Sequence, residues 1–311
     1  MTRGFLTDSI HFQFDGHAQP EPGLSRHPSL SGILPVMNLD KQTVRGFGDE
    51  WQRFGRLNVP DYDQMVHDYF AIFPWESLPP NAEGFDLGCG SGRWAKYVSA
   101  RVGRLHCIDA SADALEVAKR NLGSFPAVSF HHASVDAIPL PDSSADFGYS
   151  LGVLHHVPDT EAGLQACVKL LKPGAPFLLY LYFAFDNKPR WYRQLWAASE
   201  LVRRVVSRTP RAVRSVLSSL LAYLVYWPLS RLAGLADRFG LNVDSIPLAY
   251  YRDKSMYVLR TDALDRFGTR LEKRFTRAQI EELMRRAGLE RIVFSERRPY
   301  WVALGYKRYD A

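Results

Sequence analysis

Residues 85–92 read FDLGCGSG, and this run decides the fold. Apolar residues before it predict a strand, a helix is predicted from about Arg93, and three glycines lie on the turn between them. Such a turn requires glycine because the backbone takes unusual dihedral angles and approaches a ligand closely. Gly92 follows the second glycine by two positions, whereas a dinucleotide-binding turn would place its third glycine at Arg93. The turn therefore predicts a nucleoside site at a helix start and argues against an NAD-dependent oxidoreductase.

A carboxylate ends the next predicted strand. Residues 93–102 carry apolar side chains at helical spacing, and residues 104–108 form a short apolar strand that ends at Asp109. This acid stands 17 positions after Gly92, where it can accept both hydroxyls of a ribose. The spacing predicts a nucleoside site and does not require a pyrophosphate.

Four motifs, in this order, resemble the class I S-adenosylmethionine-dependent methyltransferases, in particular their small-molecule, methyltransferase-11-like branch. They are DLGCGSG from Asp86, SFHHASVDAIPLPDSSAD at 129–146, SLGVLHHVPD at 150–159 and LLKPG at 170–174. The resemblance implies an α/β, Rossmann-like fold with a central, mostly parallel seven-stranded sheet and helices on both faces. It also implies S-adenosylmethionine as the cofactor.

The same resemblance assigns cofactor contacts. Asp86 is expected at the methionine part and Asp109 at the ribose. The family often carries Asp after the third strand, but that slot falls on Ser134 here, with Asp136 two positions on; which of them meets the adenine stays open. The residues expected to bind the cofactor are Asp86, Gly88, Cys89, Gly90, Gly92, Asp109, Ala110, Ser134, Val135, Asp136, Leu151 and His156.

Composition changes divide the chain into four parts. We expect an irregular N-terminal extension at 1–45, rich in Pro, Gly, Ser and His, and a helical cofactor cap at 46–80. The methyltransferase core is expected at 81–186 and 275–311, with a long fifth strand from Phe177 to Phe185. Residues 187–274 are expected to insert a helical lid between that strand and the last core helix, which begins after Thr276. Aromatic residues of the cap are expected to pack between helices, with direct cofactor contact as the alternative: Trp51, Phe54, Tyr69 and Phe70.

The insert has its own chemistry. Residues 187–235 hold nine Lys or Arg and one acid, a net charge of +8, whereas the whole chain carries +6. Beside this charge, Ser215–Ser230 is uncharged, looks too short to span a bilayer and is interrupted by Pro228. Two interpretations stay open: a helical cap packed on the core, and a lid that meets a membrane surface or a lipid substrate. Nucleic-acid binding is not expected, because no recognition motif accompanies the charge.

Acceptor chemistry is expected past strands four and five. His156, or its neighbour His155, is the candidate general base for an acceptor hydroxyl, with capping or cofactor packing as the alternative role of His156. Tyr182, Tyr250 and Tyr251 are candidate acceptor contacts. The charged run 250–270 is expected first as a salt-bridged turn, with an acceptor pocket as the alternative. No metal site is expected, because adjacent histidine pairs point apart on a strand.

These observations predict an S-adenosylmethionine-dependent methyltransferase that acts on a small-molecule or lipid-linked acceptor, at a hydroxyl oxygen. Nitrogen or carbon acceptors are alternatives, and so is a non-catalytic partner or scaffold subunit that keeps the nucleoside site. Three unpaired cysteines and an N-terminus without a signal-peptide core predict a cytoplasmic protein. Peripheral contact with the inner membrane surface through the basic insert, and a homodimer, are left open.

Overall fold

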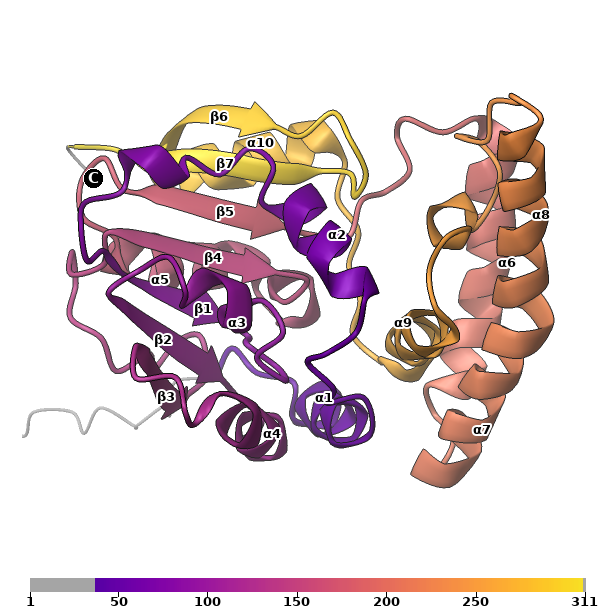
Figure 1. Ribbon diagram of the computed structural model, residues 1–311, viewed down its shortest axis with the longest axis horizontal. Helices are drawn as coiled ribbons and strands as arrows, with labels where there is room; N and C mark the ends of the chain where they lie inside the picture. The colour runs from indigo at the N-terminus through magenta and orange to yellow at the C-terminus, as the bar shows by residue number, and fades with distance from the viewer. Residues whose placement is uncertain (1–36, 310–311) are drawn as a thin grey trace, which may run out of the picture. The chain divides into compact units, whose positions relative to one another are not determined.

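A seven-stranded sheet forms the core of the protein, in the order β3-β2-β1-β4-β5-β7-β6 (Figure 1). Its strands are β1 (Glu83–Leu87), β2 (Arg104–Asp109), β3 (Val128–His132), β4 (Phe147–Leu151), β5 (Pro176–Tyr180), β6 (Leu289–Phe294) and β7 (Val302–Lys307). The first five strands are parallel, and β7 runs antiparallel to both of its neighbours. The expected α/β architecture with a mostly parallel seven-stranded sheet is confirmed.

The computed structural model describes residues 37–309. Most of the irregular extension expected at 1–45 therefore lies outside the described residues. Its last five residues are helical, because α1 (Lys41–Arg53) begins at Lys41, where the Asp40 side chain caps the helix by accepting a hydrogen bond from the Thr43 amide at 2.7 Å.

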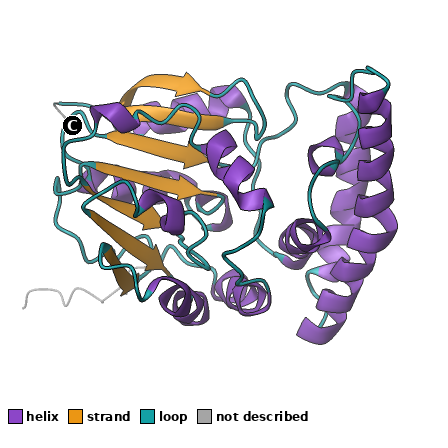
Figure 2. Ribbon diagram, viewed as in Figure 1, coloured by secondary structure: helices purple, strands orange, loops and turns teal. Residues whose placement is uncertain are grey.

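Helices cover both faces of the sheet (Figure 2). One face packs against α2 (Asp61–Tyr69), α3 (Ala95–Val98) and α4 (Ala112–Leu122), beside the short turn η1 (Trp75–Ser77). The other face packs against α5 (Thr160–Leu170) and α10 (Arg277–Arg286). Side chains of β5 alternate between the two layers: Leu178 faces the first and Phe177 the second, which is why this strand is apolar throughout.

The fifth strand is shorter than the apolar run predicted. It ends at Tyr180, and the expected continuation to Phe185 is wrong. Phe183 instead forms an isolated parallel bridge with Phe275, and Phe185 takes a left-handed conformation with φ of 58°. The apolar character of this run comes from packing beneath the insert, which the sequence does not distinguish from packing inside a sheet.

The insert is helical, as expected. It contains α6 (Arg190–Val206), α7 (Arg211–Leu221), the π-helical segment η3 (Ala222–Tyr226), α8 (Trp227–Arg238), the turn η4 (Ala249–Tyr251) and α9 (Met256–Gly268). Figure 1 draws α6, α7 and α8 beyond α9, away from the sheet. We call these three helices, with η3, the outer lid.

The predicted interruption at Pro228 is wrong. Residues Arg211–Arg238 form one helix of 28 residues that passes from α7 through η3 into α8. Pro228 lies in the first turn of α8, where a missing amide proton costs little because the preceding π turn already shifts the hydrogen-bond pattern. By length and composition this is the single helix among the described residues that could cross a membrane, so the prediction that the run is too short to do so is also wrong.

Candidate functional site

The glycine turn packs tightly against the cap and the end of β4. Gly88, Gly90 and Gly92 have φ values of 77°, 55° and 82°, which only glycine adopts readily. A Cβ atom at Gly90 would lie 2.7 Å from the indole of Trp51 on α1. Helix α3 begins at Ala95, two residues later than expected. The turn therefore lies directly beneath the cap, with no room for a larger residue.

Asp109, at the end of β2, is held by the same turn. Its Oδ2 accepts a hydrogen bond from the Gly90 amide at 2.9 Å, and its Oδ1 accepts one from the Ser111 amide at 2.8 Å. Burial raises the pKa of this carboxyl, although both amides favour the charged form. Each oxygen keeps a further lone pair, so the carboxylate is oriented and still able to accept hydroxyl protons.

A cavity of about 680 Å³ extends from this turn to the insert. Seven of the expected cofactor residues line it: Gly88, Cys89, Asp109, Ala110, Val135, Leu151 and His156. Trp51 and Tyr69 line it too, whereas Phe54 and Phe70 are buried in the packing of the cap. The volume is in the usual range for a small-molecule site.

The other expected cofactor residues lie outside the cavity wall. Asp86 is buried under the turn, and burial raises its pKa to about 8. Ser134 donates a hydrogen bond to Asp136 at 2.5 Å, and Asp136 also accepts one from the Asn38 amide. Gly90 and Gly92 belong to the turn but do not line the cavity. The contacts predicted for Asp86, Ser134 and Asp136 stay predictions.

Arg93 also lines the cavity. From the sequence, its position only argues against a dinucleotide-binding turn, and no ligand contact is predicted for it. Its guanidinium lies 5.0 Å from the ring centre of Trp51 and 4.6 Å from that of Trp94. Among residues 37–309 it takes part in no salt bridge. A cation held by aromatic rings beside the glycine turn is suited to an anionic group of a ligand.

His156 also lines the cavity, and it lies on the short turn η2 (Leu154–His156) after β4. Its Nδ1 donates a hydrogen bond to the carbonyl oxygen of Leu271 at 2.6 Å. Because a carbonyl can only accept, the neutral ring carries its proton on Nδ1 and its lone pair on Nε2. Nε2 has no hydrogen-bond partner and lies 3.9 Å from Oδ1 of Asp265, which also lacks one.

His155, the other candidate base, does not line the cavity. It is fully buried and stacks on Tyr182 with ring centres 3.9 Å apart. Burial, followed by the charges of His156 and Arg274, lowers the pKa of His155 well below its usual value. The expectation that this histidine pair points apart on a strand is wrong: both residues lie on a 3₁₀ turn, with ring centres 3.9 Å apart.

Helix α9 supplies the acidic wall of the cavity. Asp262 and Asp265 both line it, so the charged run 250–270 is a pocket wall and not only a salt-bridged turn. Burial raises the pKa of Asp262 to about 6, while Arg93 and Tyr251 oppose the shift. Burial also raises the pKa of Asp265, against the effects of His156 and of Tyr182, whose hydroxyl donates to it.

All three tyrosines predicted to contact the acceptor line the cavity: Tyr182, Tyr250 and Tyr251. Arg274 lies 5.0 Å from the ring centre of Tyr182, and the two rings of Tyr250 and Tyr251 meet edge to face at 5.2 Å. Within residues 37–309 there is no group of three or more His, Cys, Asp or Glu side chains that could hold a metal ion. The cavity wall thus combines aromatic rings with charged side chains.

Comparisons with known proteins agree with this geometry. The family described as "Methyltransferase domain" matches residues 85–179. The ubiquinone biosynthesis O-methyltransferase of Nitrosomonas europaea is 30% identical over 53% of this chain and 69% of its own length. The 2-phytyl-1,4-naphtoquinone methyltransferase of Trichormus variabilis is 28% identical over 63% of this chain and 86% of its own.

Among solved structures, the phosphoethanolamine N-methyltransferase 2 of Haemonchus contortus, with S-adenosylhomocysteine bound, covers 81% of this chain and 43% of its own length. It is 15% identical, with a TM-score of 0.46. The share of curated relatives that the chain covers ranges from 24% to 89% of their length.

The residues of the turn fit S-adenosylmethionine. Asp109 offers an oriented carboxylate for a ribose, Arg93 offers a cation for a carboxylate, and Trp51 and Tyr69 offer aromatic surface over the turn. Strand order, glycine turn, family match and relatives lead to one conclusion. The chain belongs to the class I S-adenosylmethionine-dependent methyltransferases, with S-adenosylmethionine as its cofactor.

Proposed function

We propose that this methyltransferase methylates a hydroxyl oxygen of a small-molecule or lipid-linked acceptor. Two relatives support the acceptor class, because one is named for ubiquinone biosynthesis and O-methylation and the other for a phytyl-naphthoquinone. The aromatic lining of the cavity suits a planar ring of this kind.

One observation carries the proposal: Nε2 of His156 and Oδ1 of Asp265 are both buried without a hydrogen-bond partner, 3.9 Å apart, and both residues line the cavity. A buried polar atom without a partner is costly, and such atoms in a cavity mark the place of a ligand group. An acceptor hydroxyl would supply the missing partner of Nε2, because it can donate its proton there. A nucleophile that needs no deprotonation would have no use for this arrangement.

S-adenosylmethionine supplies a methyl group on a positively charged sulfur; when an oxygen takes this methyl, the carbon–sulfur bond breaks and S-adenosylhomocysteine is left. Nε2 of His156 takes the hydroxyl proton as the oxygen becomes nucleophilic. The Leu271 carbonyl holds the ring in place, and the carboxylate of Asp265 stabilises the resulting imidazolium. The aromatic walls exclude water and hold the acceptor ring in position.

The test is transfer of a labelled methyl group to matched aromatic acceptors that carry a hydroxyl, an amine or neither. We expect a methyl ether from the hydroxyl compound and little product from the others. Methylation at nitrogen or ring carbon would contradict the proposal. Tight cofactor binding without transfer to any fraction of a host extract would instead favour a non-catalytic partner subunit.

A further inference from the structure

The outer lid exposes many apolar side chains. Seventeen of the twenty large hydrophobic side chains that are exposed within residues 37–309 lie between Trp191 and Leu241. Leu224 is 71% exposed and Leu232 is 61% exposed, so most of each side chain is in contact with solvent. Scattered exposed apolar residues are normal, but a concentration on one set of helices marks an interaction surface. We call this surface the lid face.

The 28-residue helix of the outer lid has two different sides. Ser218, Ala222, Tyr226 and Ser230 are buried and recur every four residues. A four-residue repeat drifts around an ordinary α-helix, and the wider turn of η3 keeps this row in line. The row packs toward α9 and η4, while the opposite side belongs to the lid face. Because α9 and η4 pack along one side of this helix, only its opposite side can meet a bilayer.

The two charged residues in the interior of this helix contact the protein. Arg214 forms an ion pair with Asp49 at 3.6 Å, and Arg231 donates hydrogen bonds to the carbonyl oxygens of Arg252 and Lys254. The one acid of α6, Glu200, is bound by Arg203 and Arg266. The middle of the lid face is therefore left without charge.

Exposed arginines remain at the two ends of the outer lid. Arg204, Arg208 and Arg211 lie around the turn between α6 and α7, where Arg204 is 3.5 Å from Glu200 and Arg211 is 2.9 Å from Asp49. Arg190, Arg193 and Arg238 lie at the opposite helix ends. An apolar band with exposed cations at both ends complements an anionic bilayer, whose acyl region takes the band and whose phosphates take the cations. A second copy of this chain would present the same positive charge.

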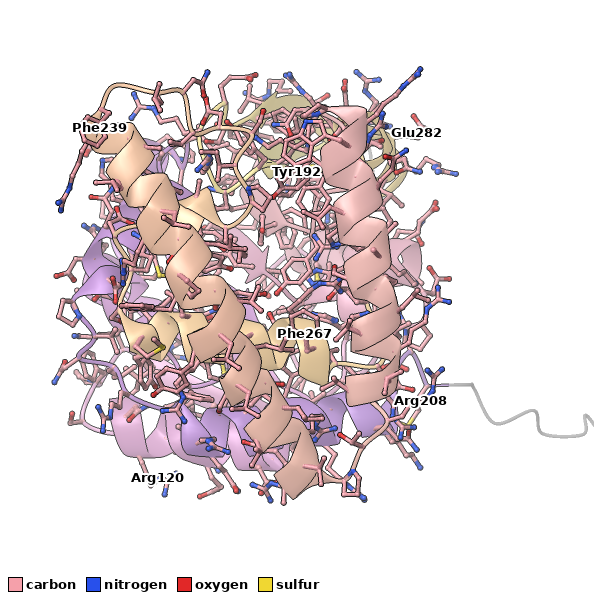
Figure 3. All side chains as sticks on the ribbon, turned by 90° about the vertical axis from the view of Figure 1, so that its right-hand side faces the viewer. Arg120, Tyr192, Arg208, Phe239, Phe267 and Glu282 are labelled. Atoms are coloured by element: carbon pink, nitrogen blue, oxygen red, sulfur yellow. The ribbon has the colours of Figure 1, made fainter. Side chains whose placement is uncertain are left out.

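The cavity reaches this surface. Leu195 and Val202 of α6, with Val225 and Leu229 of the long helix, line the cavity and are also exposed on the lid face. Figure 3 views these helices from outside and shows the cavity residues Tyr192 and Phe267 between them. The opening between α6 and the long helix is thus apolar on both sides.

We infer that the lid face binds the surface of an anionic bilayer, and that the acceptor is a lipid whose polar ring enters the cavity between α6 and the long helix while its tail stays in the bilayer. The second part rests on the proposed function. Binding of the lid face to a bilayer is argued from the lid face alone, and its test does not require methyl transfer.

The experiment is flotation of the full chain with vesicles of phosphatidylcholine, with and without 30% phosphatidylglycerol. We expect flotation with the anionic vesicles and at least a fivefold loss between 50 mM and 500 mM salt, because salt screens the arginines. L224E/L232E should abolish flotation, and R204S/R208S should reduce it several-fold. V293E, which alters an exposed residue of β6, and K119S/R120S on α4 are the matched controls and should float like wild type.

Cofactor affinity and the unfolding temperature are measured for each variant, so that a misfolded protein is recognised. If L224E/L232E does not fold, F239S/L241S replaces it, because both residues are exposed at the end of the lid face. No flotation by wild type, or equal flotation by lid and control variants, overturns the inference. So does a dimer that L224E/L232E disrupts while vesicles have no effect.

Acceptor access is tested with one aromatic alcohol carrying either no tail or a long isoprenoid tail embedded in vesicles. We expect R204S/R208S to lower transfer to the tailed acceptor several-fold and to leave transfer to the soluble one unchanged. Equal effects on both acceptors overturn lateral access. No transfer to either, with flotation intact, contradicts the proposed function and not the membrane surface.

Discussion

The carbonyl oxygen of Leu271 accepts a hydrogen bond from Nδ1 of His156 at 2.6 Å, although the residues are 115 positions apart in the chain. The end of the insert therefore fixes the orientation of a ring that follows β4. A second hydrogen bond joins the same two segments: the Lys273 amide donates to the His155 carbonyl oxygen at 3.1 Å. The insert and the candidate base are thus one structural unit.

Replacing His156 tests its role as the base. H156Q should lower kcat by about 10²–10⁴ because proton removal is lost, while cofactor affinity changes little. The measurement combines single-turnover methyl transfer with calorimetry of cofactor binding. H67Q, on the exposed surface of α2, is the control and should behave as wild type. Unchanged transfer by H156Q would remove His156 from the mechanism.

Asp109 is predicted to bind the ribose. D109A should weaken S-adenosylmethionine binding by about 10- to 100-fold, the usual effect of losing hydrogen bonds to a charged group. Calorimetry with the cofactor and with S-adenosylhomocysteine gives the affinity. D142A removes an exposed carboxylate paired with Lys169 and should leave the affinity unchanged. An equal affinity of D109A and wild type would contradict this assignment.

Arg93 is predicted to bind the carboxylate of the cofactor's methionine part. R93M keeps most of the side-chain volume against Trp51 and Trp94 but removes the charge. We expect about 10-fold weaker binding of S-adenosylhomocysteine and no change for methylthioadenosine, which lacks the carboxylate. Equal losses for both ligands would show that Arg93 acts through packing alone.

The parts of the fold set by short stretches of sequence could be predicted. The glycine turn, Asp109 and the start of the last core helix after Thr276 depend on neighbouring residues. For the charged run 250–270, which contains Asp262 and Asp265, an acceptor pocket is only the alternative interpretation of the sequence, because charged side chains on a helix usually face water. Their role depends on where α9 packs, and nothing local specifies that position.

The same limit explains two errors, one at Pro228 in the insert and one at the end of the fifth strand. Pro228 usually ends a helix, but it falls in the one turn where its missing amide is tolerated. The run 177–185 has the apolar composition of a buried strand, and its last residues are covered by the insert instead. In both places a partner distant in sequence overrides the local preference.

Asp86 should make the protein without cofactor less stable as pH rises. Its pKa is about 8 in the folded state and near 4 when unfolded, so folding favours the protonated form. This stability is complete below pH 4 and is lost as pH rises toward 8, by up to about 1.4 kcal/mol for each pH unit. Thermal unfolding should therefore show D86N more stable than wild type at pH 8 and equal to it near pH 4. A difference that does not change with pH would contradict the assigned cause.

Removing the outer lid should separate cofactor binding from membrane binding. Lys188 donates a hydrogen bond to the Asp244 carbonyl at 2.7 Å, so the chain ends around the outer lid lie close together. A variant with residues 190–242 replaced by a short Gly-Ser linker keeps α9 and the acidic wall. We expect it to bind S-adenosylmethionine like wild type, to lose flotation and to lose transfer to a tailed acceptor. Retained flotation would place the membrane contact elsewhere.

The bridge between Phe183 and Phe275 brings both ends of the insert to one point beside the sheet. The Ala184 amide donates to the Phe275 carbonyl, and the Phe275 amide donates to the Tyr182 carbonyl, which closes the insert off from the core strands. Loop-closure entropy changes slowly with loop length, so the core tolerates long, short or different insertions here at little cost. Acceptor range can therefore diverge by exchange of one segment during evolution, while the machinery that holds the methyl donor is inherited unchanged.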